Sequence, residues 1–494
     1  MFVELHIIQN FPPSNLNRDD LGQPKDADFG GYRRARISSQ CLKRSTRYAG
    51  RNSKTNAKPV FLKYTGVPLS VRTQLVASEI AKRLNEDYDK PKSAAETIAR
   101  WFAEAYAGDM KDANPNETSV LLYLSESEII WAAAHLADAW DTLVVAMATE
   151  TPVQVLAKSF VHSLAQRVQQ PSKADKVVSA RDLGKEIQQR LNKRIGSAKD
   201  VDAVSKEFGK AFKELKSEAK TFLPEEVDWI ADHIAAEWQS IQTSTHAVSL
   251  VKEIVSQFTK ITTGYTSAPD IALFGRMLAG KPLNIDAACQ VAHAISTNSI
   301  AGRTPIDYYT AVDDLKTDPG AGFLDVAYFN SACFYRYARL DYAQLQANIS
   351  ATNLQGEDLS ELPLRTVEAF LRASEAAIPA GKKNAFAPEC RPSFMLAVVR
   401  SSESDGWSLV NAFQKPVDPR MELDGDLVAG SVRRLEKHFG HLVEFYGNET
   451  IQAIAVALPD GVVDQKQLGD RFSVNVKNMQ AWVKTITDAL HSGG

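Results

Sequence analysis

Residues 15–47 read NLNRDDLGQPKDADFGGYRRARISSQCLKRSTR, and they decide how the chain begins to fold. Their first half is rich in turn formers, because Pro24 and the pair Gly30–Gly31 favour tight turns and close backbone approach. Ser38 or Ser39 can then cap the N-terminus of a helix that runs through QCLKRSTRY. We therefore expect a loop that leads into a basic helix.

A strand precedes this segment. VELHIIQN from Val3 has the alternation of a strand, and FPPS ends it because proline cannot donate to a ladder. After Gly264, strand-like stretches follow in SAPDIALFGRML, FNSACFYRYARLDY, PSFMLAVVRS and IQAIAVAL. A lone strand needs partners, so we expect the first strand to join the later ones in one antiparallel sheet. The predicted fold class is α+β.

A long helical region interrupts this core. From about Val71 to Lys260 apolar residues recur at helical spacing, as in TQLVASEIAKRLNE and AAETIARWFAEAYA. We expect residues 61–260 to form a helical lobe, and residues 1–60 with 261–494 to form the core. Within the core we expect helices near AACQVAHAIS, LPLRTVEAFLRASEAAI and VRRLEKHFGHLVEFY. Residues 172–220, rich in Lys, Asp and Glu, suit solvated helices or a mobile insertion.

Composition excludes several classes of protein. The chain has 494 residues, of which 44% are hydrophobic and 24% charged, as in ordinary globular proteins. No apolar run approaches the ~20 residues that cross a bilayer, and the N-terminus lacks the basic region of a secretion signal. We therefore expect a cytoplasmic protein. Its four cysteines, at 41, 289, 333 and 390, form no CxxC pair, which argues against disulfides and a cysteine zinc site.

Charge is distributed unevenly along the chain. The net charge is -3, yet Phe29 to Ser78 contain no Asp or Glu and eleven Lys or Arg. This window therefore carries +11 and the remainder -14. Such a segregated basic segment predicts binding to a polyanion.

The predicted helix concentrates this charge on one side. Gln40, Lys43, Arg44 and Arg47 are three or four residues apart and so share a face. The helix N-terminus adds unpaired amides, which favour phosphate beside the glycine pair. A solvated basic face is the ordinary alternative for so short a run. The absence of acids, the preceding glycines and the two serines favour binding to phosphates.

The block at residues 15–47 closely resembles the N-terminal signature of the CasC family, the repeated backbone subunit of the type I-E CRISPR surveillance complex Cascade. Further blocks follow in the family's order: DIALFGRM from Asp270, AHAIS from Ala292, TAVDDL from Thr310 and FNSACFYRYARLDYAQLQ from Phe329. The combination is specific, whereas one block alone would be weak. The resemblance is strong over the first fifty residues and about 268–350. Residues 50–265 form a longer region than is usual in the family.

The resemblance implies an RNA-recognition-motif-like (ferredoxin-like) antiparallel sheet, a helical finger-like lobe and a protruding thumb loop. It implies several copies polymerised along one guide RNA, which pairs with a target DNA strand, together with other Cascade subunits and no catalytic step. Carried onto this sequence, the grip on the guide backbone falls on nine residues: Asn17, Arg18, Lys25, Ser38, Ser39, Gln40, Lys43, Arg44 and Arg47. Four further arginines are also expected to bind RNA: Arg33, Arg34, Arg36 and Arg276.

Two further regions match family positions that handle a displaced base. Met277 matches an apolar side chain that packs against the base, although a methionine that closes a strand is as often part of the core. The thumb should lie at about 297–329, where Tyr308, Tyr309 and Thr310 are expected to contact RNA. One tyrosine is expected to stack on a base and the other to pack beneath the loop.

Catalytic alternatives find little support. Asp19–Asp20 or Asp313–Asp314 could hold Mg²⁺ for RNA cleavage, as related type III backbone subunits do, but neither pair has a third ligand nearby. His438 and His441 are too few for a metal site, and GxSxG, GxxxxGK[ST] and GxGxxG are absent. No metal or cofactor is expected. A metal-dependent endoribonuclease and a protein-only scaffold that binds an acidic partner remain the alternatives to a non-catalytic RNA-binding subunit.

Overall fold

The structure is a computed structural model of the chain. The residues that it describes are 1–51, 57–108, 110–111, 114–147, 178–179, 182–195, 201–202, 204–206, 208–209, 221–264, 266–277, 284–300, 305–312, 315, 321–349, 359–402, 405–421, 425–473 and 476–492. They fall into two compact units, Met1–Ser70 with Thr263–Gly494, and Val71–Thr262. Each unit is described by itself.

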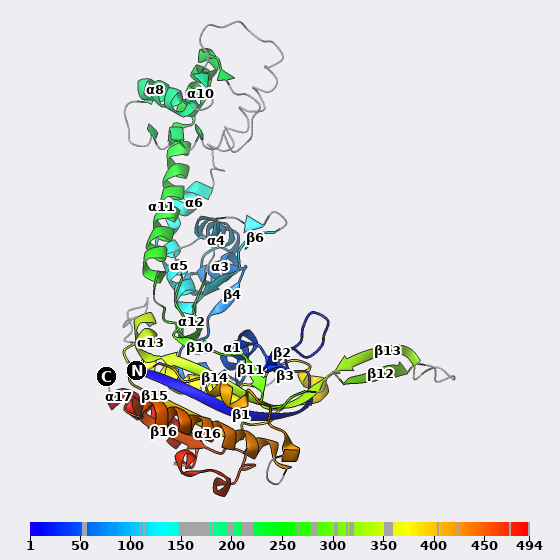
Figure 1. The fold of residues 1–494 in the computed structure, drawn as a ribbon. Coiled ribbons are helices and arrows are strands. Elements are labelled where there is room, and N and C mark those ends of the chain that lie inside the picture. The colour runs from blue at the N-terminus through cyan, green and yellow to red at the C-terminus, as the bar shows by residue number, and fades with distance from the viewer. Residues whose placement is uncertain are drawn as a thin grey trace. The chain divides into compact units, whose positions relative to one another are not determined.

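The first unit is built on an eight-stranded antiparallel sheet in the order β16-β15-β1-β14-β11-β3-β2, with β10 also pairing with β14 (Figure 1). The strands are β1 (Phe2–Ser14), β2 (Asp26–Phe29), β3 (Tyr32–Ile37), β10 (Cys289–Val291), β11 (Ala294–Ser296), β14 (Asn330–Asp341), β15 (Phe394–Arg400) and β16 (Ile451–Ala457). β1 pairs with β14 on one side and with β15 on the other. The expected α+β fold, with the first strand joined to later strands in an antiparallel sheet, is confirmed.

Alternation along β1 divides the core into two layers, because successive side chains of a strand point to opposite faces. Val3, Leu5 and Ile7 pack beneath α14 (Leu362–Ala376) and α17 (Met479–Ser492). Ile8 lies on the other face, with Phe413 of η1 (Leu409–Phe413) and Val432 of α16 (Leu427–Tyr446). The sheet is therefore covered on both faces.

The second face also holds a buried polar cluster. The Arg400 Nε atom donates to Glu4 Oε2 at 2.6 Å, and both side chains are fully buried. His6 shares its Nδ1 with the Tyr335 hydroxyl at 2.8 Å. Burial, with a smaller contribution from the Arg400 charge, lowers the pKa of His6 to about 3. The His6 imidazole is therefore neutral in the folded chain at all but strongly acidic pH.

Two predicted elements are wrong. SAPDIALFGRML, expected as a strand, contains α12 (Pro269–Phe274), because Pro269 suits the first helical turn and Gly275 ends the helix at φ +79°. AACQVAHAIS, expected as a helix, contains β10 and β11. Cys289 pairs with Leu340 of β14, and Ile295 pairs with β14 and β3. Pairing with strands distant in sequence overrides the local preference.

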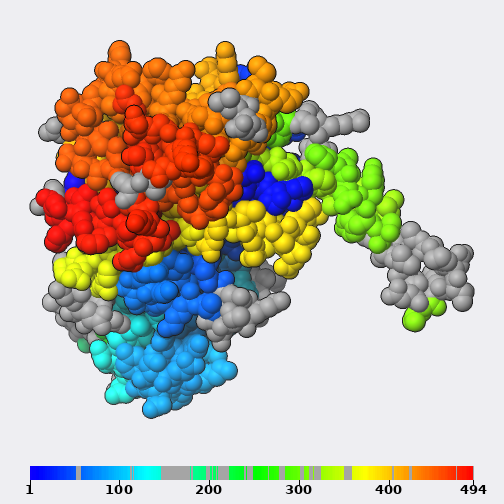
Figure 2. Space-filling model, turned by 90° about the horizontal axis from the view of Figure 1, so that it is seen from below, coloured from blue at the N-terminus to red at the C-terminus, as the bar shows by residue number. Residues whose placement is uncertain are grey.

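A hairpin made of β12 (Ile306–Val312) and β13 (Ala321–Tyr328) leaves the sheet between β11 and β14. Its strands form a two-stranded sheet of their own, with Ile306 opposite Tyr328 and Thr310 opposite Leu324. Figure 2 shows it standing clear of the C-terminal helices. This hairpin occupies the region where the thumb was expected.

The second unit is mainly helical. Its principal helices are α3 (Val76–Tyr88), α4 (Lys92–Ala107), α5 (Glu126–Asp138), α6 (Trp140–Met147), α8 (Leu183–Ile195), α10 (Pro224–Ala236) and α11 (Trp238–Thr262). Ser125 and Glu128 form a capping box at the start of α5. Most of the charged segment 172–220 lies outside the described residues; within it, α8 packs its apolar face against α10.

Candidate nucleic-acid interface

The predicted basic helix is α1 (Ser39–Arg47), and Ser38 is its N-cap, with the Oγ atom accepting the Cys41 amide at 3.3 Å. The Ser38 amide donates to Asn17 Oδ1 at 2.8 Å, and the Ser39 amide donates to His293 Nδ1 at 3.1 Å. The predicted cap is confirmed. These bonds hold the loop before β2 against the helix. They also engage the Ser38 and Ser39 amides and the Ser38 hydroxyl, which are among the polar groups expected to bind phosphate.

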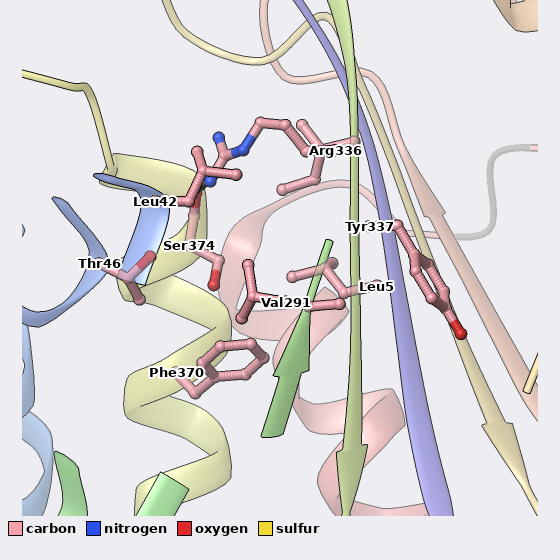
Figure 3. Close-up of a pocket in the computed structure, with 10 residues that line it drawn as sticks. Leu5, Leu42, Thr46, Val291, Arg336, Tyr337, Phe370 and Ser374 are labelled. Atoms are coloured by element: carbon pink, nitrogen blue, oxygen red, sulfur yellow. Dashed lines mark hydrogen bonds between the residues drawn. The ribbon is translucent and has the colours of Figure 1, made fainter. Parts of the chain in front are cut away.

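The inner face of α1 is apolar and fixes the orientation of the helix. Leu42 and Thr46 line a small cavity together with Phe370 and Ser374 of the neighbouring α14 (Figure 3). Arg336 of β14 donates to the Ser374 carbonyl at 2.8 Å. With this face buried, Gln40 and Arg44 are exposed and Lys43 is half-buried. We call Gln40, Lys43 and Arg44 the outer face of α1.

Arg47 does not belong to this outer face. Its side chain is 10% exposed, and its Nε donates to Asp270 Oδ2 at 2.8 Å while Nη2 donates to the Ser70 carbonyl at 3.0 Å. Ser70 Oγ also donates to Asp270 at 2.6 Å. Arg47 was predicted to bind RNA, and the structure instead assigns it to a buried ion pair. Helical spacing could not reveal this partner, which is 223 residues away.

Three arginines of β3 were also predicted to bind RNA. Arg34 is fully buried, and its guanidinium donates to the carbonyls of Ser296 at 2.8 Å and Phe413 at 2.6 Å. Burial lowers the pKa of Arg34 to about 10, so it is still charged at neutral pH. The prediction for Arg34 is wrong, because its donors tie β3 to β11 and η1. Arg33 bonds the Asp26 carboxylate at 2.6 Å and Arg36 the Asp26 carbonyl at 3.0 Å, although both side chains are partly exposed.

A groove of about 1030 Å³ lies along α1 on the side of Cys41, Arg44 and Ser45. We call it the α1 groove. Its lining comprises Leu16, Asn17, Arg18, Asp19, Asp20, Gly22, Cys41, Arg44, Ser45, Tyr48, Ala49, Gly50, Arg51, Ala376, Ile378, Ala380, Gly381 and Lys383. It thus unites Asn17, Arg18 and Arg44, which were predicted from the sequence. Sequence reasoning missed the other cationic and aromatic members: Tyr48, Arg51 and Lys383. Arg51 could have been found from its place in the acid-free window, whereas only the fold brings Lys383 near.

Met277 and its neighbour Arg276 differ in their exposure to solvent. Met277 is 87% exposed, so it is available to a ligand and is not a core methionine. Arg276 is buried, and its backbone exchanges hydrogen bonds with Ile285 at 2.9 and 2.8 Å. Arg276 was predicted to bind RNA, and its burial contradicts a direct contact in this conformation.

The two hairpin tyrosines differ in their bonding. Tyr309 donates its hydroxyl to Asp325 Oδ2 on the opposite strand at 2.7 Å, which raises the pKa of the phenol. Tyr308 is 65% exposed and Thr310 is exposed. Tyr309 is 45% exposed, so neither ring packs beneath the loop as expected for one of them. Asp313 and Asp314 lie outside the described residues.

The acids and histidines weighed as catalytic groups have other contacts. Asp19 Oδ1 accepts the amides of Leu21 and Gln23, at 2.9 and 2.8 Å, and so holds a turn. Desolvation and the neighbouring His441 lower the pKa of His438. Among the described residues, no group of three His, Cys, Asp or Glu is placed to hold a metal ion. Within the residues that the structure describes, no helix is long and apolar enough to cross a membrane.

Comparison with known proteins decides the family. The sequence matches the family described as CT1975-like protein over residues 3–174 and 157–484, which together span most of the chain. The chain belongs to the CT1975-like family. This is the CasC family of type I-E CRISPR systems, so the resemblance seen in the sequence blocks is confirmed. A CT1975-like protein is a backbone subunit of a type I-E CRISPR RNA-guided surveillance complex.

Two solved structures are similar to this CT1975-like chain. One, titled "CRISPR RNA-guided surveillance complex, pre-nicking", has a TM-score of 0.61 and 24% identity over 99% of this chain and 100% of that one. Another, titled "CRISPR RNA-guided surveillance complex", has a TM-score of 0.54 and 21% identity over the same shares. At these identities the likeness shows a shared fold. No curated protein matches the CT1975-like chain.

Proposed function

We propose that this subunit is non-catalytic and binds the backbone of a guide RNA along the outer face of α1 and the α1 groove. One observation carries the proposal: Arg18 and Arg44 line one groove, Lys43 precedes Arg44 on the same helix, and among the described residues no carboxylate forms an ion pair with any of the three. Cations left without a counter-charge favour a polyanion, because each phosphate that they neutralise releases counterions.

The remaining predicted residues divide into ligands and supports. Asn17, Lys25 and Gln40 would supply additional polar contacts, with Asn17 also holding Ser38. The buried Arg34 and Arg47 keep β3 and α1 in place. Contacts of this kind hold the phosphate backbone without reading bases, so base recognition belongs to the guide when it pairs with target DNA.

The hairpin supplies a second contact. We propose that Tyr308 stacks on a displaced guide base, because its ring is the more exposed of the two and the Tyr309 hydroxyl is held by Asp325. Thr310 and Met277 are proposed to line the path of the same nucleotide. Stacking on an aromatic ring contributes about 1 to 3 kcal/mol per base and would offset the loss of stacking within the guide.

Several copies of this subunit would assemble along one guide, together with other subunits of the surveillance complex. The test is binding of the purified chain, freed of nucleic acid, to labelled single-stranded RNAs of increasing length, across a salt series. We expect salt-sensitive binding and larger assemblies on longer RNA. Absence of binding would refute the proposal.

A nuclease is the second candidate to be tested. The same RNAs are incubated with the chain and Mg²⁺, and intact RNA is expected. Cleavage that disappears in Asp19→Asn or Asp313→Asn would establish the endoribonuclease alternative.

A further inference from the structure

Tyr48, at the C-terminal end of α1, is surrounded by three guanidinium groups. The Cζ atoms of Arg44, Arg47 and Arg51 lie 5.3, 5.0 and 5.5 Å from the centre of its ring. These are cation–π distances, which are electrostatically favourable because the ring face is negative. The helix and the turn after it have therefore gathered three cations around one aromatic side chain.

The backbone explains how Arg51 reaches this place. Arg44 and Tyr48 are one helical turn apart, and Tyr48 closes the helix with its amide bonded to the Arg44 carbonyl. Gly50 then adopts φ +76°, a conformation that costs little in glycine, and the Arg51 amide returns to the Tyr48 carbonyl at 3.1 Å. The chain reverses, and Arg51 reaches the same tyrosine ring as Arg44.

The charges in this cluster are not all balanced. Arg47 is paired with Asp270, whereas among the described residues no carboxylate forms an ion pair with Arg44 or Arg51. Arg44 and Arg51 are thus two like charges that share one aromatic ring, and they repel each other because salt screens charges fully only beyond about 8 Å. A ring face offsets part of this repulsion, and a bound anion would remove the rest.

The groove around the cluster suits a nucleotide. Arg44, Tyr48 and Arg51 line the α1 groove together with the apolar Ile378 and with Lys383, whose ammonium group pairs with Glu389. Cations beside apolar and aromatic surface are the combination by which proteins hold single-stranded nucleic acid. Asp19 and Asp20 also line the groove, but the Asp19 carboxylate is occupied by two backbone amides.

We propose that Arg44 and Arg51 together clamp one phosphodiester of single-stranded RNA in the α1 groove, with Tyr48 as the residue that positions both guanidinium groups. The inference rests on the proposed RNA binding and extends it to a contact and a positioning residue that the family resemblance did not provide. Arg51 touches the phosphate; Tyr48 acts through the two arginines.

The test uses the full chain and a labelled oligouridylate, with affinity measured by fluorescence anisotropy across a salt series. Arg51→Gln is expected to weaken binding roughly threefold to tenfold and to reduce the salt slope by about 0.7, the value for one lost phosphate on a single strand. Tyr48→Ala is expected to weaken binding at least as much, whereas Tyr48→Phe, which keeps the ring, should bind like the unaltered chain.

Arg72→Gln is the matched control, because it removes one arginine of the same basic window that also lies over a tyrosine, Tyr123, but does not line the groove. If Tyr48 positions Arg51, then in a Tyr48→Ala background Arg51→Gln should lower RNA affinity less than it does in the unaltered chain. Additive losses would overturn the role of Tyr48.

The outcomes separate the clamp from the proposed function. If the unaltered chain binds no RNA, the proposed function fails. If Lys43→Gln weakens binding while Arg51→Gln and Tyr48→Ala leave affinity and salt slope unchanged, RNA binding stands and the clamp is refuted. Polyglutamate should displace RNA more readily from Arg51→Gln than from the unaltered chain. Equal displacement would also refute the clamp, because Arg51 would then not help to hold the phosphate.

Discussion

Arg47 offers the sharpest contrast between a charge seen in the sequence and its place in the fold. If Arg47 only contacted RNA, its replacement would have little effect on the stability of the fold. In the structure Asp270 is fully buried and Arg47 is 10% exposed, and their ion pair is completed by Ser70. We predict that Asp270→Asn, which keeps the side-chain volume but removes the charge, lowers the free energy of unfolding of this region.

The magnitude follows from burial. Removal of one partner leaves the other charge uncompensated in a low-dielectric site, which costs about 3 to 5 kcal/mol. Hydrogen exchange of peptides covering α1 and α12, followed at increasing urea concentration, measures this locally, which matters in a chain with two compact units. The surface pair Arg420–Asp418, with Arg420 88% exposed, is the control, and Asp418→Asn should leave the free energy of unfolding nearly unchanged.

A double variant tests the cause. Replacing both partners, Arg47→Met with Asp270→Leu, should recover much of the stability, because an apolar pair needs no desolvation of charge. The reasoning would be refuted if Asp270→Asn behaved like the surface control. It would also be refuted if Arg47→Met reduced RNA affinity while local hydrogen exchange stayed unchanged, since Arg47 would then act on the ligand.

Three further predictions concern separate surfaces. Lys43→Gln with Arg44→Gln should lower RNA affinity and reduce the salt slope by about 1.4 in a salt series, two phosphates at about 0.7 each; an unchanged slope would count against the outer face of α1. Tyr308→Ala should weaken RNA binding by about 1 to 3 kcal/mol in the same assay while Tyr309→Phe stays near the unaltered value, and the reverse order would exchange their roles. Burial lowers the pKa of His6 to about 3, so between about pH 3 and 6.5 the imidazole binds a proton in the unfolded chain but not in the folded one. The free energy of unfolding should therefore fall by about 1 kcal/mol over the pH unit below about 6. If urea titrations of a His6→Gln variant showed the same fall, His6 would not be its cause.

Much of the site could be predicted because its signals are local. The capping serine and the spacing of Gln40, Lys43 and Arg44 follow from helix geometry, and the family blocks name the same residues. The error at Cys289–Ser296 has a different origin, because this short segment takes its structure from strands far along the chain. At Pro269–Phe274 the helix signals, Pro269 and Gly275, were local, but the apolar run between them was interpreted as a strand.

By itself, the sequence determined the α+β class, the first strand's need for partners, the basic helix with its cap, and the family. These depend on periodicity, local hydrogen bonding and charge, which act over a few residues. Only the tertiary structure decided which cations stay accessible to a ligand. Arg34 and Arg47 look like Arg44 in the sequence, but the carbonyls of Phe413 and the carboxylate of Asp270 reach them through the fold. A charged group's role depends on whether it is desolvated and paired, and that is set by residues hundreds of positions away.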